Sequence, residues 1–320
     1  MKAFKALLMR EYWEHRGAFI KTPVIMGIIT AVVLILAYLL VEKVDVDFNS
    51  GQGIDYGLSQ LDSINSDHIS IVTNTFLTGM EGVYHFVLFI VIFFFLLGSL
   101  FDDRKDLSIL FWKSLPVSDL STVLSKLVTA LIIAPLCFWA ILIASELVAM
   151  VLFSLFLLFN GANPFTLLWA NTDLLGHWAA FGLGCLVQGL WALPIYGWLL
   201  LCSSWAKRRP FIWAVGVPAT VFFFRGWFAA FSFSAQSFMN VAEILKAIGT
   251  IFLNSIAPYE SRSDFITSSF DLGANELTQA GQIMQSMLSG LYTSQIIYGI
   301  IMAAVCAAIA IFLRRYRNTT

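Results

Sequence analysis

Six runs of apolar residues, each long enough to cross a lipid bilayer as a helix, constrain the fold of this chain most strongly. About 20 helical residues span the roughly 30 Å of hydrocarbon in a bilayer, and charged residues bound these runs. Their approximate cores are 20–41, 83–101, 120–148, 178–202, 211–231 and 291–313. The sequence therefore predicts an all-α, polytopic membrane protein, with six transmembrane helices in a single domain over residues 1–320.

The composition supports a membrane location for the whole chain. Hydrophobic residues make up 59% of the chain and charged residues only 12%, whereas soluble domains are about a quarter charged. The first apolar run is followed by Glu42 and Lys43 without a small-residue cleavage site, so we expect an uncleaved first span rather than a signal peptide. The four cysteines all fall inside apolar runs, and we expect no disulfide from them.

The distribution of basic residues predicts the orientation of the spans. One set of alternate segments holds 15 of the 19 Lys and Arg residues, while the other set holds only Lys43, Lys246 and Arg262. Basic residues concentrate in cytoplasmic loops. We therefore expect both ends of the chain to be cytoplasmic.

Three stretches leave their local structure open. The third apolar stretch continues to Phe159, which exceeds the bilayer as a straight helix, so either Pro135 kinks it or residues 149–159 lie at the outer surface. Residues 42–82 are polar and glycine-containing, which predicts an irregular external loop. Residues 232–290 contain two patches with helical spacing, which predict short external amphipathic helices: one holds Val241, Ile244, Leu245, Ile248 and Phe252, and the other Ile283, Met284, Met287 and Leu288.

The first 17 residues, MKAFKALLMREYWEHRG, are a candidate interfacial helix. Apolar and aromatic side chains alternate there with basic ones, as in helices that lie in the plane of a membrane surface. The candidate anchors are Phe4, Leu7, Leu8, Tyr12 and Trp13. The alternative interpretation is a basic flank that only fixes the topology.

The predicted cytoplasmic segment 102–119 is the most informative part of the chain. Asp106 is a plausible N-cap for a short helix, which Pro116 stops, and Ser118 with Asp119 can begin the next helix. The residues expected to form or flank the short helix are Asp106, Leu107, Ile109, Leu110, Phe111, Trp112, Lys113 and Leu115. Exposed aromatic residues on such a helix need a cover, either lipid headgroups or a protein groove. The flanking charges of both signs favour a protein groove.

Three features together resemble permeases of the bacterial type-2 ABC exporter family: REYWEHRG, the six spans with both ends inside, and DRKDLSILFWKSLPVS after the second span. The resemblance implies a permease of the cytoplasmic membrane in which the N-terminal helix lies on the membrane surface. It also implies that a coupling helix, here Asp106 to Leu115 with Phe111 and Trp112 as anchors, docks in a groove of an ATPase. Surface helices between the fifth and sixth spans are a further family feature.

The resemblance implies two permease subunits, as a homodimer or with a related second permease, and two ABC ATPase subunits. No G-x-x-x-x-G-K-[ST] sequence occurs in the chain, so we expect ATP and magnesium on the partner and neither ATPase activity nor a cofactor in this chain. An amphiphilic, peptide or lipid-like substrate is implied by the family alone. The bilayer, and an external partner at the 42–82 loop, complete the expected partners; nucleic acid is not among them.

Two charged residues, Glu146 and Arg225, fall within apolar runs. Such residues mark a pathway or a pair, so Glu146 pairing with Arg225 is one hypothesis, and Arg225 reaching toward the headgroups is the other. The four histidines are spread over both predicted sides, so no metal site is expected. The alternatives to an exporter are an ATP-independent secondary transporter or channel, and a membrane anchor or sensor that transports nothing.

Overall fold

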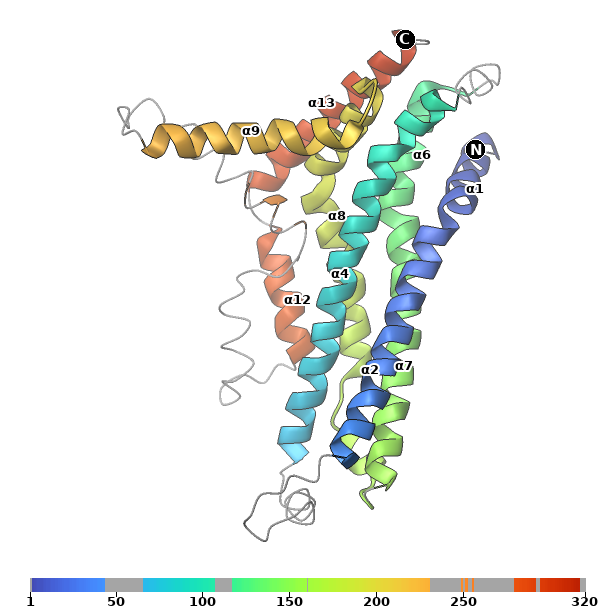
Figure 1. Ribbon diagram of the computed structural model, residues 1–320, viewed down its shortest axis with the longest axis vertical. Helices are drawn as coiled ribbons and strands as arrows, with labels where there is room; N and C mark the ends of the chain where they lie inside the picture. The colour runs from blue at the N-terminus through green and yellow to red at the C-terminus, as the bar shows by residue number, and fades with distance from the viewer. Residues whose placement is uncertain are drawn as a thin grey trace.

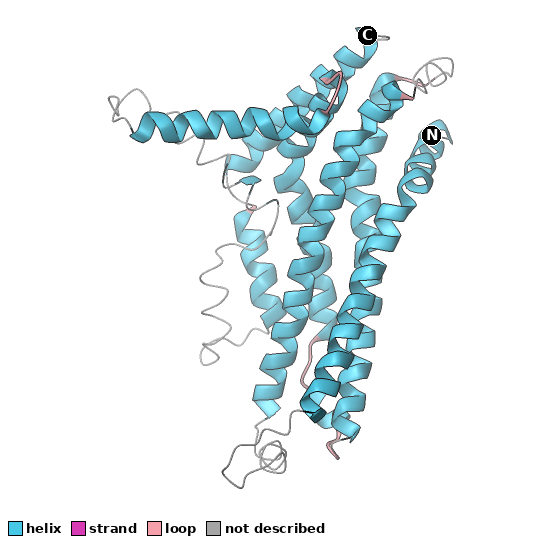
Figure 2. Ribbon diagram, viewed as in Figure 1, coloured by secondary structure: helices cyan, strands magenta, loops and turns pink. Residues whose placement is uncertain are grey.

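The computed structural model describes residues 2–43, 66–106, 117–159, 161–230, 249, 251–252, 255, 279–291 and 294–316. Over these ranges helix is the only regular secondary structure (Figure 2). The all-α prediction is therefore confirmed for the described part of the chain. The helices and their bounds are α1 Lys2–Arg16, η1 Gly17–Lys21, α2 Thr22–Lys43, α4 Ser66–Lys105, α6 Asp119–Val128, η2 Thr129–Ile133, α7 Ala134–Phe159, η3 Phe165–Trp169, α8 Leu174–Trp205, α9 Pro210–Ala230, α12 Gln279–Gly290 and α13 Ser294–Tyr316.

Within the described residues, five helices are long and apolar enough to cross a membrane. They are Ala3–Leu40, Ser70–Lys105, Asp119–Phe159, Leu174–Trp205 and Ile296–Tyr316. These helices stand side by side, and α1 and the end of α13 lie at the same end of the bundle (Figure 1). We call this the α1 end, and the opposite end the far end.

The predicted fifth span forms α9, but this helix runs crosswise to the bundle near the α1 end (Figure 1). It packs against α8 and α4, and the indole Nε1 of Trp198 donates a hydrogen bond to the carbonyl oxygen of Ala214 at 3.0 Å. Among the residues searched, its apolar stretch is Pro210–Val221, shorter than the five candidate spans. A sixth span stays a prediction.

The third apolar stretch is one helix from Asp119 to Phe159, formed by α6, η2 and α7. The π-helical turn η2 ends two residues before Pro135. A proline has no N–H to donate to the carbonyl of Leu131, and its ring crowds that carbonyl. The wider turn therefore accommodates the proline inside a continuous helix. At the far end, Phe156 packs edge-on against Tyr38 of α2, with ring centroids 5.5 Å apart.

Helix α4 begins at Ser66, so part of the predicted irregular loop 42–82 is helical. Polar residues recur at helical spacing in this stretch. One of them, Ser70, donates a hydrogen bond from its hydroxyl to the carbonyl oxygen of Asn171 at 3.0 Å. Hydropathy did not indicate the helix because its buried face mixes polar residues with apolar ones. Residues 44–65 lie outside the described residues.

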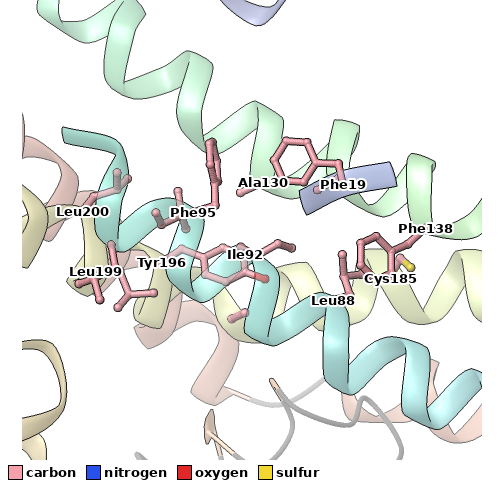
Figure 3. Close-up of a cluster of buried hydrophobic side chains, with 14 of the residues drawn as sticks. Phe19, Leu88, Ile92, Phe95, Ala130, Phe138, Cys185, Tyr196, Leu199 and Leu200 are labelled. Carbon is pink, nitrogen blue, oxygen red and sulfur yellow. The ribbon is translucent and has the colours of Figure 1, made fainter. Parts of the chain in front are cut away.

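The main core lies between α4, α7 and α8 (Figure 3). Leu88 and Ile92 of α4, Phe138 of α7 and Tyr196 of α8 are all buried there. Phe19 of η1 is fully buried and packs edge-on against the ring of Phe95 of α4, with 5.4 Å between centroids. The π-helical turn η1 thus joins α1 to α2 and buries the ring of Phe19 in the core.

A smaller core joins α12 to α8. Ile283 and Met287 are buried against Val187 and Trp191, so α12 buries two residues of the second predicted amphipathic patch. Of the first predicted patch, Phe252 is described and helical; Val241, Ile244, Leu245 and Ile248 lie outside the described residues.

Candidate functional site

Six charged side chains from four helices meet at the α1 end. We call them the ion network: Arg10, Glu11, Asp103, Asp119, Lys126 and Arg314. They come from α1, α4, α6 and α13. Three are cationic and three anionic, so the formal charge of the network is zero.

Asp103 is the hub of the ion network. Its Oδ1 accepts a hydrogen bond from Nη2 of Arg10 at 2.9 Å, and its Oδ2 lies 3.5 Å from Nζ of Lys126 and 3.6 Å from Nη1 of Arg314. All four side chains are largely removed from solvent. Because one carboxylate faces three cations on three other helices, Asp103 ties α4 to α1, α6 and α13.

Two further ion pairs of the ion network are also hydrogen-bonded. Nζ of Lys126 donates to both carboxylate oxygens of Glu11, at 3.0 and 3.2 Å, and both residues are fully enclosed. Nε of Arg314 donates to Oδ1 of Asp119 at 2.9 Å. A buried charge is stable only when it is paired and hydrogen-bonded, and this arrangement compensates every member.

The ion network flanks the predicted coupling helix, Asp106 to Leu115, on both sides. Asp103 precedes this stretch on α4, and Asp119 opens α6 after it. The predicted cap of α6 is confirmed, since the hydroxyl of Ser118 accepts a hydrogen bond from the backbone N–H of Ser121 at 3.1 Å. Nη2 of Arg104 donates to the carbonyl oxygens of Ser203 and Ala206, at 2.6 and 2.9 Å, which fixes the same end of α4 to α8.

The coupling residues themselves are mostly not described. Asp106 closes the last turn of α4, where its backbone N–H donates to the carbonyl oxygen of Asp102 at 2.9 Å. Leu107, Ile109, Leu110, Phe111, Trp112, Lys113 and Leu115 lie outside the described residues. The coupling helix therefore stays a prediction.

The candidate interfacial residues fall on α1, which continues into α2 toward the far end (Figure 1). Leu7 is buried, Phe4, Leu8 and Tyr12 are half-buried, and Trp13 is exposed. The buried face of α1 packs on α6. The contact of α1 with a membrane surface stays a prediction.

A second set of buried polar groups lies between α4, α7 and α8. We call it the carboxyl cluster: Asn74, Glu81, Glu146, His177 and Trp178. Nδ1 of His177 is 2.9 Å from Oε1 of Glu81, and its Nε2 is 3.3 Å from Oδ1 of Asn74. The indole Nε1 of Trp178 donates to Oε2 of Glu146 at 2.8 Å.

The other oxygens of the two carboxyl groups have no hydrogen-bond partner among the described residues. These are Oε2 of Glu81 and Oε1 of Glu146, both enclosed by protein atoms. The side chain of Arg225 lies outside the described residues, so its pairing with Glu146 stays a prediction. Nearby, Nε2 of Gln188 donates to the carbonyl oxygens of His85 and Ser255, both at 3.0 Å.

Sequence reasoning found Glu146 but missed the rest of both clusters. Glu11 and Lys126 are 115 positions apart, and Glu81 and His177 are 96 apart. No local pattern connects such residues. The available signal was weak: Ser70, Asn74 and Glu81 share one face of a helix that hydropathy alone did not indicate.

The five long apolar helices define the class of this chain, a multi-pass α-helical membrane protein. No protein-family model matches the chain, and no curated protein or solved structure matches it. Among the described residues, no group of three or more His, Cys, Asp or Glu side chains could hold a metal ion.

Proposed function

We propose that this chain is the membrane-spanning subunit of an ATP-driven exporter in the cytoplasmic membrane of a bacterium. A separate ABC ATPase would bind ATP and magnesium, and a second permease subunit would complete the pathway for an amphiphilic, peptide or lipid-like substrate. The observation that carries the proposal is the placement of the ion network at both ends of segment 102–119.

The ion network supports a lever function for that segment. A force on the segment reaches α4 through Asp103 and α6 through Asp119, and the contacts of Asp103 with Arg10 and Arg314 pass it to α1 and α13. Removing one partner of a buried ion pair typically destabilises by about 3–5 kcal/mol. In the proposed mechanism these contacts make the four helix ends move as one body, as a coupling device requires.

Copurification tests the proposal. The tagged chain is co-expressed with candidate ABC ATPases, and the double variant Phe111→Asp, Trp112→Asp is compared with the matched control Phe111→Leu, Trp112→Phe. We expect the native chain and the control to retain the ATPase, and the aspartate variant to lose it. Equal recovery with the aspartate variant, or no association of the native chain with any ABC ATPase, would overturn the proposal.

A second candidate function is ATP-independent secondary transport, and the carboxyl cluster is what favours it. Buried ionisable residues within spanning helices are typical of ion-coupled transporters, and Glu81, Glu146 and His177 are all buried. Proteoliposomes that contain this chain alone and a pH-sensitive dye discriminate between the two candidates. Proton flux driven by an ion gradient without ATPase or ATP supports the second candidate, and a flux equal to that of empty liposomes contradicts it.

A further inference from the structure

We propose that the carboxyl cluster is a proton-binding site, in which Glu146 holds the proton while α4, α7 and α8 are packed together. The inference does not depend on an ATPase partner. It rests on the two unpartnered carboxyl oxygens and on the charges that surround them.

The contacts of His177 tie it to Glu81 and Asn74. Its Nδ1 lies 2.9 Å from Oε1 of Glu81, and its Nε2 lies 3.3 Å from Oδ1 of Asn74. The amide of Asn74 is oriented by its Nδ2, which donates to the hydroxyl of Ser70 at 3.2 Å. Both ring nitrogens of His177 are therefore engaged, and among the described residues no hydrogen bond or ion pair joins His177 to Glu146.

Among the described side chains, none places a compensating charge against Glu146. It is fully buried, and its one partner, the indole of Trp178, is a neutral donor. Glu81 lies close enough to repel a second carboxylate electrostatically. An isolated carboxylate in such an interior is strongly unfavourable, and the group takes up a proton instead.

Among the described side chains, the other titratable groups facing this region supply no additional cation. From α4 they are the phenol of Tyr84, which bonds Ser145 and the carbonyl oxygen of Pro23, and the ring of His85, which bonds Gln188. From α8 there is the thiol of Cys185, and from the described side chains of α2 the phenol of Tyr38, at the far end.

The enclosure of the two free oxygens limits the size of the ligand. Each has almost no exposed surface, so a hydrated ion or an organic cation does not fit without separating the helices. A proton needs no additional room. Separation of α7 from α4 and α8 would admit water and release the proton from Glu146, so proton binding is coupled to the packing of these helices.

Infrared spectroscopy of the purified full chain in nanodiscs tests the proposal. A protonated carboxyl group has a carbonyl band well separated from that of a carboxylate. At neutral pH we expect this band in the native chain and in the control Glu14→Gln, which changes a half-exposed glutamate, and we expect the band to be lost in Glu146→Gln.

Each result has a defined meaning. Absence of the band from the native chain at neutral pH overturns the proposal, and so does a band that survives in Glu146→Gln but disappears in Glu81→Gln. If Glu146→Gln does not fold, Trp178→Phe replaces it: loss of the indole hydrogen bond shifts the band of a protonated Glu146, and an unshifted band contradicts the assignment. ATPase association plays no part in this readout, so its failure is distinguishable from failure of the exporter proposal.

Discussion

The ion network and the carboxyl cluster solve the burial of charge in opposite ways. At the α1 end, three cations and three anions from four helices compensate one another through direct contacts. Between α4, α7 and α8, one carboxyl group pairs with a histidine and the other only with a neutral indole, and an oxygen of each has no hydrogen-bond partner among the described residues. The first arrangement is stable as a set of charges, whereas the second is stable only if one acid is neutral.

The ion network is a set of fixed ion pairs that join helices, whereas the carboxyl cluster is a site whose charge can change. Every member of the ion network contacts an opposite charge, and neutralising any one of them leaves its partners without that compensation. In the carboxyl cluster, a proton on Glu146 removes a buried charge that no described side chain compensates. Neutralising an acid should therefore have very different effects in the two regions.

The largest expected effect is that of Asp103→Asn. The substitution leaves the cations Arg10, Lys126 and Arg314 without their shared anion, so we expect the stability of the bundle to fall by about 3–5 kcal/mol. Thermal unfolding of the detergent-solubilised chain measures the loss. The control Glu14→Gln removes a half-exposed i,i+4 pair and should change stability by at most about 0.5 kcal/mol. Equal transition temperatures for the two variants would contradict the role of Asp103 as hub.

The pair of Glu11 and Lys126 gives the next largest effect. Lys126→Met leaves the buried carboxylate of Glu11 without its cation, and Glu11→Leu leaves the ammonium of Lys126 without its anion. Each single variant should therefore be strongly destabilised. The double variant removes both charges and should recover about 0.5–3 kcal/mol relative to the sum of the single losses. Additive losses in this double-mutant cycle would show that the two side chains do not interact as placed.

Helix packing outside both clusters provides a smaller effect. A Cβ atom on Gly197 of α8 would lie 2.9 Å from the backbone Cα and O of Ala303 on α13, so Gly197→Ala must push the two helices apart, at a cost of about 1–3 kcal/mol. A Cβ atom added to Gly79 of α4 would meet no atom of another residue within 4 Å. Gly79→Ala should therefore leave stability unchanged or raise it by up to about 1 kcal/mol. A reversed order of the two transition temperatures would contradict the α8–α13 contact.

Local patterns predicted much of the fold and little of the clusters. The runs behind α2, α8 and α13 are predominantly apolar, and the Ser118 cap is set by neighbouring residues, so both follow from the sequence alone. The direction of α9 and the early start of α4 depend on distant packing partners. The sequence shows Asp103 as an acid that follows a predicted span, but its sequence neighbours give no sign that three cations on three other helices contact it.

The smallest expected effect is that of Glu146→Gln, and it is the sharpest test of the contrast. If Glu146 is already neutral, the amide keeps the shape of the group and can still accept from Trp178, so stability should change by less than about 1 kcal/mol at neutral pH. As pH rises from mildly acidic to neutral, the native chain should lose stability because the unfolded chain ionises this acid while the folded chain keeps it protonated, whereas the variant has no proton to lose at this position. Thermal unfolding across a series from mildly acidic to neutral pH measures both. A loss at neutral pH as large as that of Asp103→Asn would mean that Glu146 is a paired anion, and the two regions would then bury charge in the same way.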